Sequence, residues 1–246
     1  ERNGERMIKL TEEKLLDYIN CPAYFDMKYI KRVPLSSKEP MSHLLKIVSN
    51  FFYLNLSNGK VAKMSELKNK WESIAEARSL TPKDTLEGLG EVHRFANWMG
   101  HEQPIVLDVN TPYTIVVGDI ELSGNLPAIF KKGDSYEFVI TDFSKKTPDQ
   151  RLIDMKLQYT IYAYAFRVLF GKEISGIRVH HVKTNKDFKT MRNENDYARM
   201  KSSINGIEKS IQSSSFYTRE SFMCASCPAV AYCSFWTNEM ETFKGG

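Results

Sequence analysis

Apolar residues recur along this chain with a helical period at both ends and with a strand period in the middle. Before residue 103, apolar side chains return every three or four positions, which is typical of helices with one buried face. Between Pro104 and Phe143 the apolar runs are short and β-branched, and turn residues separate them, which indicates strands. The pattern therefore predicts an α/β protein with a helical N-terminal subregion.

The helices expected before residue 103 carry start and stop signals. Thr11 precedes two acidic residues and fits an N-cap, and Thr81 with Pro82 combines a cap with a first-turn proline. Gly100 is the expected stop of the last of these helices. The expected helical ranges are 12–20, 22–29, 42–56, 61–77 and 82–99.

The middle of the chain is expected to form the sheet. A Lys-Lys-Gly-Asp turn at 131–134 indicates a hairpin, and three or four strands of an antiparallel meander fit between 105 and 143. A helix over 149–170, a strand over 174–182 and a helix over 195–211 should follow. The economical arrangement is one mixed central sheet flanked by helices.

We expect one compact domain over residues 1–246, because no repeat or linker-like stretch divides the chain. Its parts would be a mainly helical region (10–103), the sheet with its core helices (104–215) and a cysteine-rich tail (216–246). Nothing resembles a signal peptide or a membrane span, so a cytoplasmic or otherwise intracellular location and no membrane partner are expected. The formal net charge of +4 permits a nucleic-acid partner without demanding one.

The cysteines carry the most specific chemical signal. Cys224, Cys227 and Cys233 lie within ten residues, and Cys21 is the fourth cysteine of the chain. A Cys-x2-Cys pair with a third thiol nearby has the spacing of metal ligands, although four unrelated buried cysteines are the alternative. Four thiolates suit either zinc or an iron–sulfur cluster, and the spacing does not choose between them.

Taken together, the motifs resemble a known family. These motifs are the Cys-Pro of Cys21, the cysteine tail, a strand with Gly124, a strand with Asp142 and a Gln-x3-Tyr helix. Over roughly residues 10 to 236 the chain resembles the RecB-like branch of the PD-(D/E)xK nucleases, and within it the four-cysteine group that includes the AddB nuclease domain and the CRISPR-adaptation exonucleases. The resemblance implies a restriction-endonuclease-like fold whose C-terminal cysteine cluster closes onto the N-terminus. It also implies that a [4Fe–4S] cluster is held by Cys21, Cys224, Cys227 and Cys233.

The resemblance carries over the catalytic residues only in part. The positions that match are His43, Asp142, Gln158 and Tyr162. Pro127 stands where the first metal-binding aspartate is expected, and Ser144 stands where the motif lysine is expected. Proline offers no ligand atom and serine no positive charge, so we expect a degenerate site and a chain that is not an active enzyme.

Two features upstream and downstream of the motif leave an active enzyme as an alternative. Lys145 and Lys146 adjoin the motif, and Asp119 and Glu121 lie just before Gly124. A metal-dependent deoxyribonuclease with a rearranged site would use Mg²⁺ or Mn²⁺. Neighbouring side chains on a strand face opposite ways, however, so Lys145 would point away unless the strand has ended.

A basic run after the sheet is the candidate nucleic-acid contact. It contains Arg178, Lys183, Lys186, Lys189 and Arg192, although a solvated charged face explains such a run equally well. Three functions remain open. The first is a degenerate nuclease domain that binds DNA single strands or ends or scaffolds a DNA recombination, repair or replication complex. The others are an active exonuclease with a rearranged site and a protein-interaction module without DNA binding. A phage or mobile element is the expected source of so divergent a copy.

Overall fold

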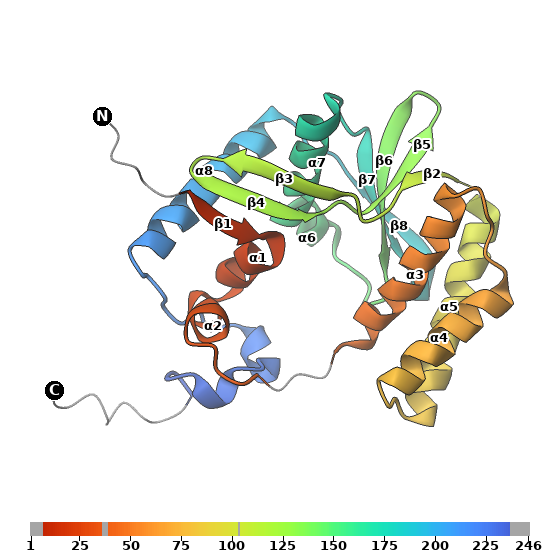
Figure 1. Cartoon of the computed structure of the whole chain (residues 1–246), viewed down its shortest axis with the longest axis horizontal. Helices are drawn as coiled ribbons and strands as arrows, with labels where there is room; N and C mark the ends of the chain where they lie inside the picture. The colour runs from red at the N-terminus through yellow and green to blue at the C-terminus, as the bar shows by residue number, and fades with distance from the viewer. Residues whose placement is uncertain (1–6, 36–38, 103, 237–246) are drawn as a thin grey trace. The chain divides into compact units, whose positions relative to one another are not determined.

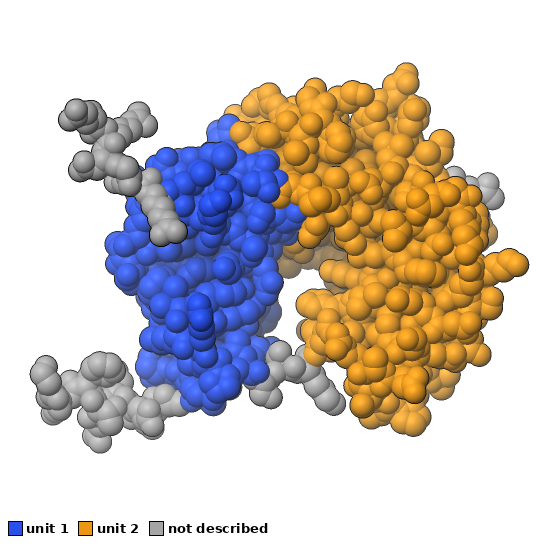
Figure 2. Space-filling model, in the orientation of Figure 1, with its two compact units in different colours: residues 1–38, 114–124, 198–246 blue, residues 39–113, 125–197 orange. Residues whose placement is uncertain are grey.

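A computed structural model of the chain describes residues 7–35, 39–102 and 104–236. The chain forms two units, each assembled from segments that are far apart in sequence (Figure 2). Unit 1 contains residues 1–38, 114–124 and 198–246, and unit 2 contains residues 39–113 and 125–197. These units do not coincide with the three parts expected from the sequence, and the single domain stays a prediction.

Unit 2 is built on a mixed sheet of five strands. The strands lie in the order β2-β5-β6-β7-β8; β6 and β7 are parallel, and the other pairs are antiparallel. Their bounds are β2 (Ile105–Asp108), β5 (Ala128–Lys132), β6 (Ser135–Asp142), β7 (Gly176–His181) and β8 (Lys186–Thr190).

Helices cover both faces of this sheet, as Figure 1 shows. On one side lie α3 (Met41–Ser57), α4 (Met64–Ala77) and α5 (Pro82–Glu102), and on the other lie α6 (Gln150–Asp154) and α7 (Leu157–Phe170). Strand β6 supplies both cores because its side chains alternate. Val139 packs in the cluster with α3, α4 and α5, whereas the Phe138 ring contacts the rings of Tyr162 and Phe166 on α7.

Unit 1 has its own sheet of three strands in the order β1-β4-β3, with β1 and β4 parallel. The strands are β1 (Ile8–Thr11), β3 (Pro112–Val117) and β4 (Ile120–Asn125), and β3 and β4 each have an end in unit 2. The helices are α1 (Glu12–Asn20), α2 (Pro22–Phe25), the π-helix η1 (Asp26–Ile30), α8 (Glu194–Gln212) and the 3₁₀ turns η3 (Phe222–Ser226) and η4 (Val230–Tyr232). The first four residues of α8 belong to unit 2.

The two ends of the chain pack against each other within unit 1. The Tyr18 hydroxyl donates to the Ser215 carbonyl at 2.8 Å, and the Ala23 amide donates to the Tyr217 carbonyl at 3.0 Å. The Phe25 and Phe216 rings stack with their centroids 6.0 Å apart. The tail therefore closes onto the N-terminal helices, as predicted.

The predicted mixed α/β fold with flanking helices is confirmed, and so are most element positions. Thr11 caps α1 by accepting from the Lys14 amide at 3.3 Å. Helix α5, however, runs through Gly100 to Glu102, so the expected stop is wrong. Strands β1 and β8 lay outside the prediction, the second because its sequence was assigned to a basic run.

The single predicted sheet is also wrong, because β1, β3 and β4 form one sheet, whereas β2 and β5 to β8 form another. The change of sheet from β4 to β5 falls at Pro127. Strand β4 ends at Asn125 and β5 begins at Ala128. Proline has no amide hydrogen and cannot donate to a strand ladder, so Pro127 separates the two strands. Likewise, the predicted helix over 149–170 breaks between α6 and α7, where Lys156 has an extended backbone (φ −71°, ψ 111°).

None of the helices in the described part of the chain combines the length and the apolar character that crossing a membrane requires.

Candidate functional site

Unit 2 contains a pocket of about 170 Å³ whose lining includes three of the positions named in the sequence analysis, Pro127, Gln158 and Tyr162. Its lining comes from α3, from the loop after β2, from the β4–β5 connection, from β6 and from the start of α7. Two lysines and several amide side chains line it, and we call it the lysine pocket: Lys46, Ser49, Asn50, Tyr53, Asn110, Asn125, Leu126, Pro127, Ala128, Val139, Ile140, Thr141, Lys156, Gln158, Tyr159 and Tyr162. Among these lining residues there is no Asp or Glu.

Helix α3 contributes one wall of the pocket. Lys46, Asn50 and Tyr53 follow one another at spacings of four and three residues, so they share a helix face. The buried Tyr53 hydroxyl lies 2.5 Å from Thr141 Oγ1, which ties the helix to β6, and burial raises the pKa of Tyr53 above its ordinary value. His43 lies one turn earlier on this face, is exposed and is not among the lining residues.

The loop after β2 is held in a fixed shape beside α3. Asp108 accepts from the Val109 amide and from the Thr111 hydroxyl, each at 2.8 Å. Asn110 then has a left-handed backbone (φ 57°), a conformation that asparagine tolerates better than most residues, and its side chain accepts from Asn50 at 3.4 Å. The loop therefore presents a preorganised amide to the pocket.

The start of α7 carries two of the predicted site residues. Gln158 donates through Nε2 to the Tyr162 hydroxyl at 2.8 Å, so the two predicted residues lie together in the pocket wall. Between them, Tyr159 is buried beneath the Lys156 ammonium, which lies 4.9 Å from its ring centroid. Burial, and secondarily the charge of Asp142, raises the pKa of Tyr159 to about 12.

Asp142 lies at the end of β6 and does not line the pocket. Its carboxylate accepts from the Ser144 amide at 2.9 Å and from the Ser144 hydroxyl at 2.9 Å. The Ser144 carbonyl accepts in turn from His181 Nε2 at 2.9 Å, which leaves His181 Nδ1 to accept from the Thr184 hydroxyl at 2.7 Å. Ser144, the residue at the lysine position, is therefore part of a closed hydrogen-bond chain.

Two of the four residues that were considered as replacements for the expected acid and lysine have other partners. Strand β6 ends at Asp142, so the alternation of a strand does not govern Lys145. The Lys145 ammonium pairs with Glu87 at 3.1 Å, and Glu121 pairs with Lys9 at 3.0 Å. Neither Lys145, Lys146, Asp119 nor Glu121 is among the residues that line the pocket.

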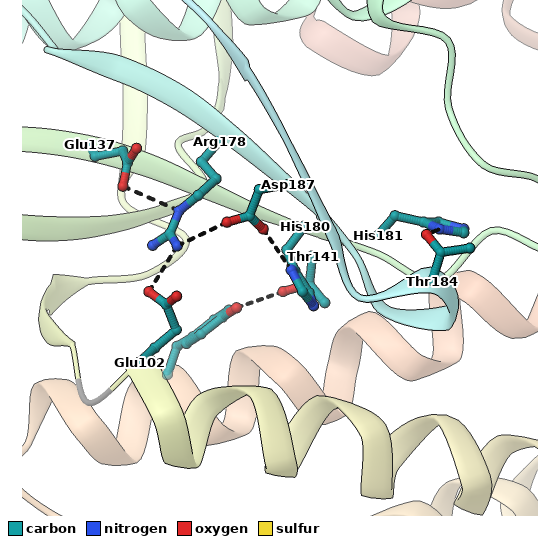
Figure 3. Close-up of polar contacts among 9 residues, drawn as sticks. Glu102, Glu137, Thr141, Arg178, His180, His181, Thr184 and Asp187 are labelled. Carbon is teal, nitrogen blue, oxygen red and sulfur yellow. Dashed lines mark hydrogen bonds and ion pairs between the residues drawn. The ribbon is translucent and has the colours of Figure 1, made fainter.

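Arg178, at the head of the predicted basic run, is buried in a network of acids (Figure 3). Its guanidinium lies 2.8 Å from Glu102, 3.3 Å from Glu137 and 3.4 Å from Asp187. Burial alone would lower the pKa of Arg178, but these carboxylates outweigh it and raise the pKa. The side chain is 9% exposed, so this arginine is part of the interior of unit 2.

His180 belongs to the same network. Its Nδ1 donates to Asp187 at 2.7 Å, and its ring stacks on Trp98 at 3.7 Å between centroids. Burial would raise the pKa of Asp187, but the hydrogen bond from His180 and the charge of Arg178 outweigh burial and lower it. The Nε2 atom of His180 is buried without a hydrogen-bond partner in the described structure.

The remaining basic residues of the run divide into two groups. Arg192 is half-buried and donates to Thr160 and Thr190, as well as to backbone carbonyls, and its burial lowers its pKa. Lys183, Lys186 and Lys189 are exposed around the β8 edge of the sheet, and their role as nucleic-acid contacts stays a prediction.

In unit 1, the four cysteines line one pocket of about 210 Å³, which we call the cysteine pocket. Cys21 follows α1, and the tight turns η3 and η4 bring the three tail thiols to the same pocket. Each cysteine is half-buried and none forms a disulfide. Burial, followed by the neighbouring charges of Cys21, Cys233 and Cys224, raises the pKa of the Cys227 thiol.

Neither pocket presents a ready set of metal ligands. Within residues 7–35, 39–102 and 104–236, no three or more His, Cys, Asp or Glu side chains form a group that could hold a metal ion. In the cysteine pocket the ligand types are present and share one space, whereas in the lysine pocket the ligand types themselves are missing.

Comparison with known proteins bears on the fold. No protein-family description matches the sequence, and no curated protein matches it. Among solved structures, the chain is similar to a "Putative exonuclease" from Eubacterium rectale, with a TM-score of 0.58 and 9% identity over 90% of this chain and 88% of that one. A second structure, SSO0001, matches at a TM-score of 0.42 and 15% identity over 81% of this chain and 98% of that one, which is too weak to argue from. The first likeness shows a shared fold. An identity of 9% is too low to transfer the role of any residue.

Sequence reasoning missed most of the residues that line the lysine pocket, among them Lys46, Asn110 and Lys156. Lys46 falls three residues after the predicted His43, on the same face of a predicted helix, so its spacing was a usable signal. Asn110 and Lys156 lie in the connections before β3 and α7, and nothing in the pattern of apolar residues distinguishes them from other polar loop residues.

Proposed function

We propose that this chain is a catalytically degenerate nuclease domain that binds DNA, as single strands or as strand ends, and that it serves in a DNA-processing assembly. The observation that supports this most is the composition of the lysine pocket. Its lining includes Gln158, Tyr162 and Pro127 as well as two lysines, and among the lining residues there is no Asp or Glu. The shared fold with a protein named as an exonuclease agrees with this proposal.

The proposed loss of catalysis follows from what a metal ion needs. Two-metal or one-metal hydrolysis of a phosphodiester requires carboxylates that hold Mg²⁺ or Mn²⁺ next to the attacked phosphate. Pro127 has no ligand atom, and the Asp142 carboxylate already accepts two hydrogen bonds from Ser144. A single carboxylate that does not line the pocket provides too few ligands to bind a divalent cation there.

The same composition favours binding of a phosphate without metal. Lysine ammonium groups attract phosphate as point charges, and amide side chains donate hydrogen bonds to phosphate oxygens. Lys46, Lys156, Asn50 and Gln158 provide both kinds of group within one pocket wall. The DNA backbone would therefore be held by the charges that would otherwise be supplied by metal ions.

A binding assay in EDTA tests the proposal. Fluorescence anisotropy with a labelled single-stranded oligonucleotide should show binding that needs no divalent cation. For two phosphate contacts on a single strand, the affinity should fall roughly sevenfold between 50 and 200 mM salt. Absent or salt-insensitive binding would contradict the proposed function.

A nuclease assay on the same preparation distinguishes the active alternative. Addition of Mg²⁺ or Mn²⁺ should leave the oligonucleotide intact. Degradation that is abolished in Asp142→Ala would establish a rearranged active site instead. Absence of both DNA binding and degradation, together with co-purification of a protein, would favour the pure interaction module.

We further propose that the cysteine pocket holds a [4Fe–4S] cluster, with zinc as the alternative, through Cys21, Cys224, Cys227 and Cys233. The thiols share one pocket, and the raised pKa of Cys227 reflects burial and mutual repulsion that a bound cation would relieve. Loading would require the side chains to turn toward the cluster, because they do not form a ligand group as they stand. The cluster would supply a covalent link between the two chain ends.

Metal analysis of an anaerobic preparation tests this assignment. Iron and acid-labile sulfide in a ratio near one, with broad absorbance near ~400 nm, are expected from iron–sulfur chemistry. Stoichiometric zinc without iron would establish the alternative, and the absence of both metals would contradict the site.

A further inference from the structure

Apolar side chains lie open to solvent along strand β2 of unit 2. Strand β2 is at one edge of the five-stranded sheet, and no strand of the described chain pairs with its outer side (Figure 1). Val106 is buried in the core cluster with α3, whereas Ile105 and Leu107 are 63% and 43% exposed. The free edge of the sheet is therefore apolar on the face away from α3.

A groove of about 360 Å³ lies on this face, between β2 and the end of α7. Leu107 lines it from β2, and Phe166 and Phe170 line it from α7. The pairing of β2 with β5 is irregular between Val106 and Asp108, which leaves Leu107 without a partner on β5. The other residues of the lining are Asp108, Ile129, Tyr136 and Lys172. The groove has the size of a ligand site, about 300–1,000 Å³, and its walls are mostly apolar.

Two lysines lie at the Tyr136 end of the groove. Lys131 follows Ile129 by two residues on β5 and is in register with Tyr136, so it shares the groove face of the sheet. The Lys172 ammonium lies 5.0 Å from the Tyr136 ring centroid and 3.2 Å from the Tyr136 hydroxyl. Neither lysine forms an ion pair with an acid of the described chain. This end of the groove is therefore cationic.

Asp108 is the one acid among the described residues that line the groove. It is in register with Ile129, whereas Lys131 lies two residues further along β5. Its carboxylate already accepts from the Val109 amide and the Thr111 hydroxyl, each at 2.8 Å. An apolar groove with two lysines at one end is complementary in charge to an apolar segment that also carries carboxylates.

We propose that this groove binds a segment of a partner protein that inserts apolar side chains between Leu107 and Phe170 and places acidic side chains beside Lys131 and Lys172. An extended segment fits, because the outer edge of β2 offers backbone amides and carbonyls to an added strand. A second copy of this chain fits less well, because a two-fold contact would bring the same lysines together. The groove shares no lining residue with the lysine pocket, so the proposal is independent of DNA binding.

Peptide display on the full chain tests the proposal. A library of random short peptides is selected on the immobilised protein and counter-selected on the Leu107→Asp variant. The enriched peptides should combine aromatic or aliphatic residues with several acids. Enriched peptides without an excess of acids, peptides that bind both proteins equally, or no enrichment at all would overturn the proposal.

Matched variants then localise the binding of one enriched peptide, labelled with fluorescein. Leu107→Asp should weaken binding about tenfold or more, because it buries a carboxylate against apolar side chains. Leu86→Asp should bind as the unchanged protein does, because Leu86 is an exposed leucine of α5 outside the groove. A urea unfolding curve for each variant shows that it is folded.

A charge-reversed pair tests the cationic end. Lys131→Glu should weaken binding of the same peptide about fivefold, the upper range for an exposed ion pair. Lys132→Glu, the next residue and on the opposite face of β5, should leave the affinity unchanged. Equal losses in the two variants would mean that net charge, and not the groove, attracts the peptide.

Sedimentation of the protein alone decides whether a second copy is the occupant. The unchanged protein should sediment as a monomer. A dimer that Leu107→Asp dissociates would overturn the acidic partner and assign the groove to a contact between copies.

Discussion

The lysine pocket of unit 2 and the cysteine pocket of unit 1 are similar in size, about 170 Å³ and 210 Å³, and both collect residues from distant parts of the chain. They differ in how their chemistry is encoded. The cysteine pocket uses four copies of a rare residue at short spacing, whereas the lysine pocket uses common polar residues from several segments. The first can be recognised in a sequence, and the second becomes visible only when the segments are assembled.

The sharpest way to break this comparison is to remove one thiol. Cys227→Ser should abolish metal loading, because the fourth ligand of a thiolate site is lost, and it should destabilise unit 1 more than any change in the lysine pocket destabilises unit 2. Metal content and thermal unfolding measure the two effects. Ser226→Ala, in the same turn, should keep the metal; if Cys227→Ser keeps it too, the cysteine pocket is not a metal site.

The second test concerns the charged interior of unit 2. Arg178→Ala leaves Glu102, Glu137 and Asp187 facing one another without their cation, and it should lower the free energy of unfolding by about 3 kcal/mol. Arg78→Ala removes an ion pair with Glu39 in which both side chains are exposed (55% and 40%), and it should cost under about 1 kcal/mol.

Urea unfolding measures both arginine variants, and DNA titration of the folded Arg178→Ala protein adds a second result. Its affinity should be unchanged, because Arg178 is buried and does not line the lysine pocket. A large loss of affinity at full stability would return Arg178 to the nucleic-acid contacts predicted from the sequence.

A third test adds an acid to the lining of the lysine pocket. Pro127→Asp adds a negative charge to the pocket wall, so in EDTA the affinity for a phosphorylated oligonucleotide should fall about tenfold, the effect of roughly 1.4 kcal/mol of repulsion. Added Mn²⁺ should recover part of this affinity by bridging the new carboxylate and the phosphate. Pro127→Asn changes the backbone equally but adds no charge, and it should bind as the unchanged protein does.

An equal loss of affinity in the Asp and Asn variants would mean that the shape of the β4–β5 connection, and not the charge of the pocket, controls binding.

The sequence predicted the parts of the fold that depend on local patterns. Thr11 caps α1, the apolar stripe of α3 forms the core, and the turn at 131–134 joins β5 to β6, because each of these is decided by neighbouring residues. The division into two sheets was missed although Pro127 is visible in the sequence. The division depends on the pairing of β4 with β1 and of β5 with β2, strands that are distant in sequence. Such long-range pairing leaves no periodic signal in the sequence.

The candidate site was predicted to a lesser degree. Gln158 donates to the Tyr162 hydroxyl, a contact that four-residue spacing on a predicted helix allows, but the partners of Arg178 could not be foreseen. Its run of basic neighbours suggested a surface, whereas β7 is a central strand and its side chains are buried on both faces. Lys183, Lys186 and Lys189 remain exposed because they lie in the turn after β7 and on the edge strand β8.

The smallest expected effect is a pH dependence within unit 2. The lowered pKa of Asp187 means that its carboxylate interacts favourably with His180 and Arg178 in the folded state. A carboxyl with a depressed folded pKa stabilises the protein above its unfolded pKa, here 3.8, and the contribution disappears as the pH falls through the folded pKa. The free energy of unfolding should therefore decline on acidification below about pH 4.

Asp187→Asn isolates this contribution. The variant should be less stable than the unchanged protein at pH 7. The difference should shrink in acid, because a protonated Asp187 is uncharged, as Asn is. Asp134→Asn, in the exposed turn before β6, is the matched control and should follow the unchanged protein at every pH. Urea unfolding at pH 7, 4 and 3 measures both variants. If the free energy of unfolding changes with pH in the same way for all three proteins, the charge of Asp187 does not stabilise the Arg178 network. Packing of His180 and Arg178 on Trp98 would then hold the network together.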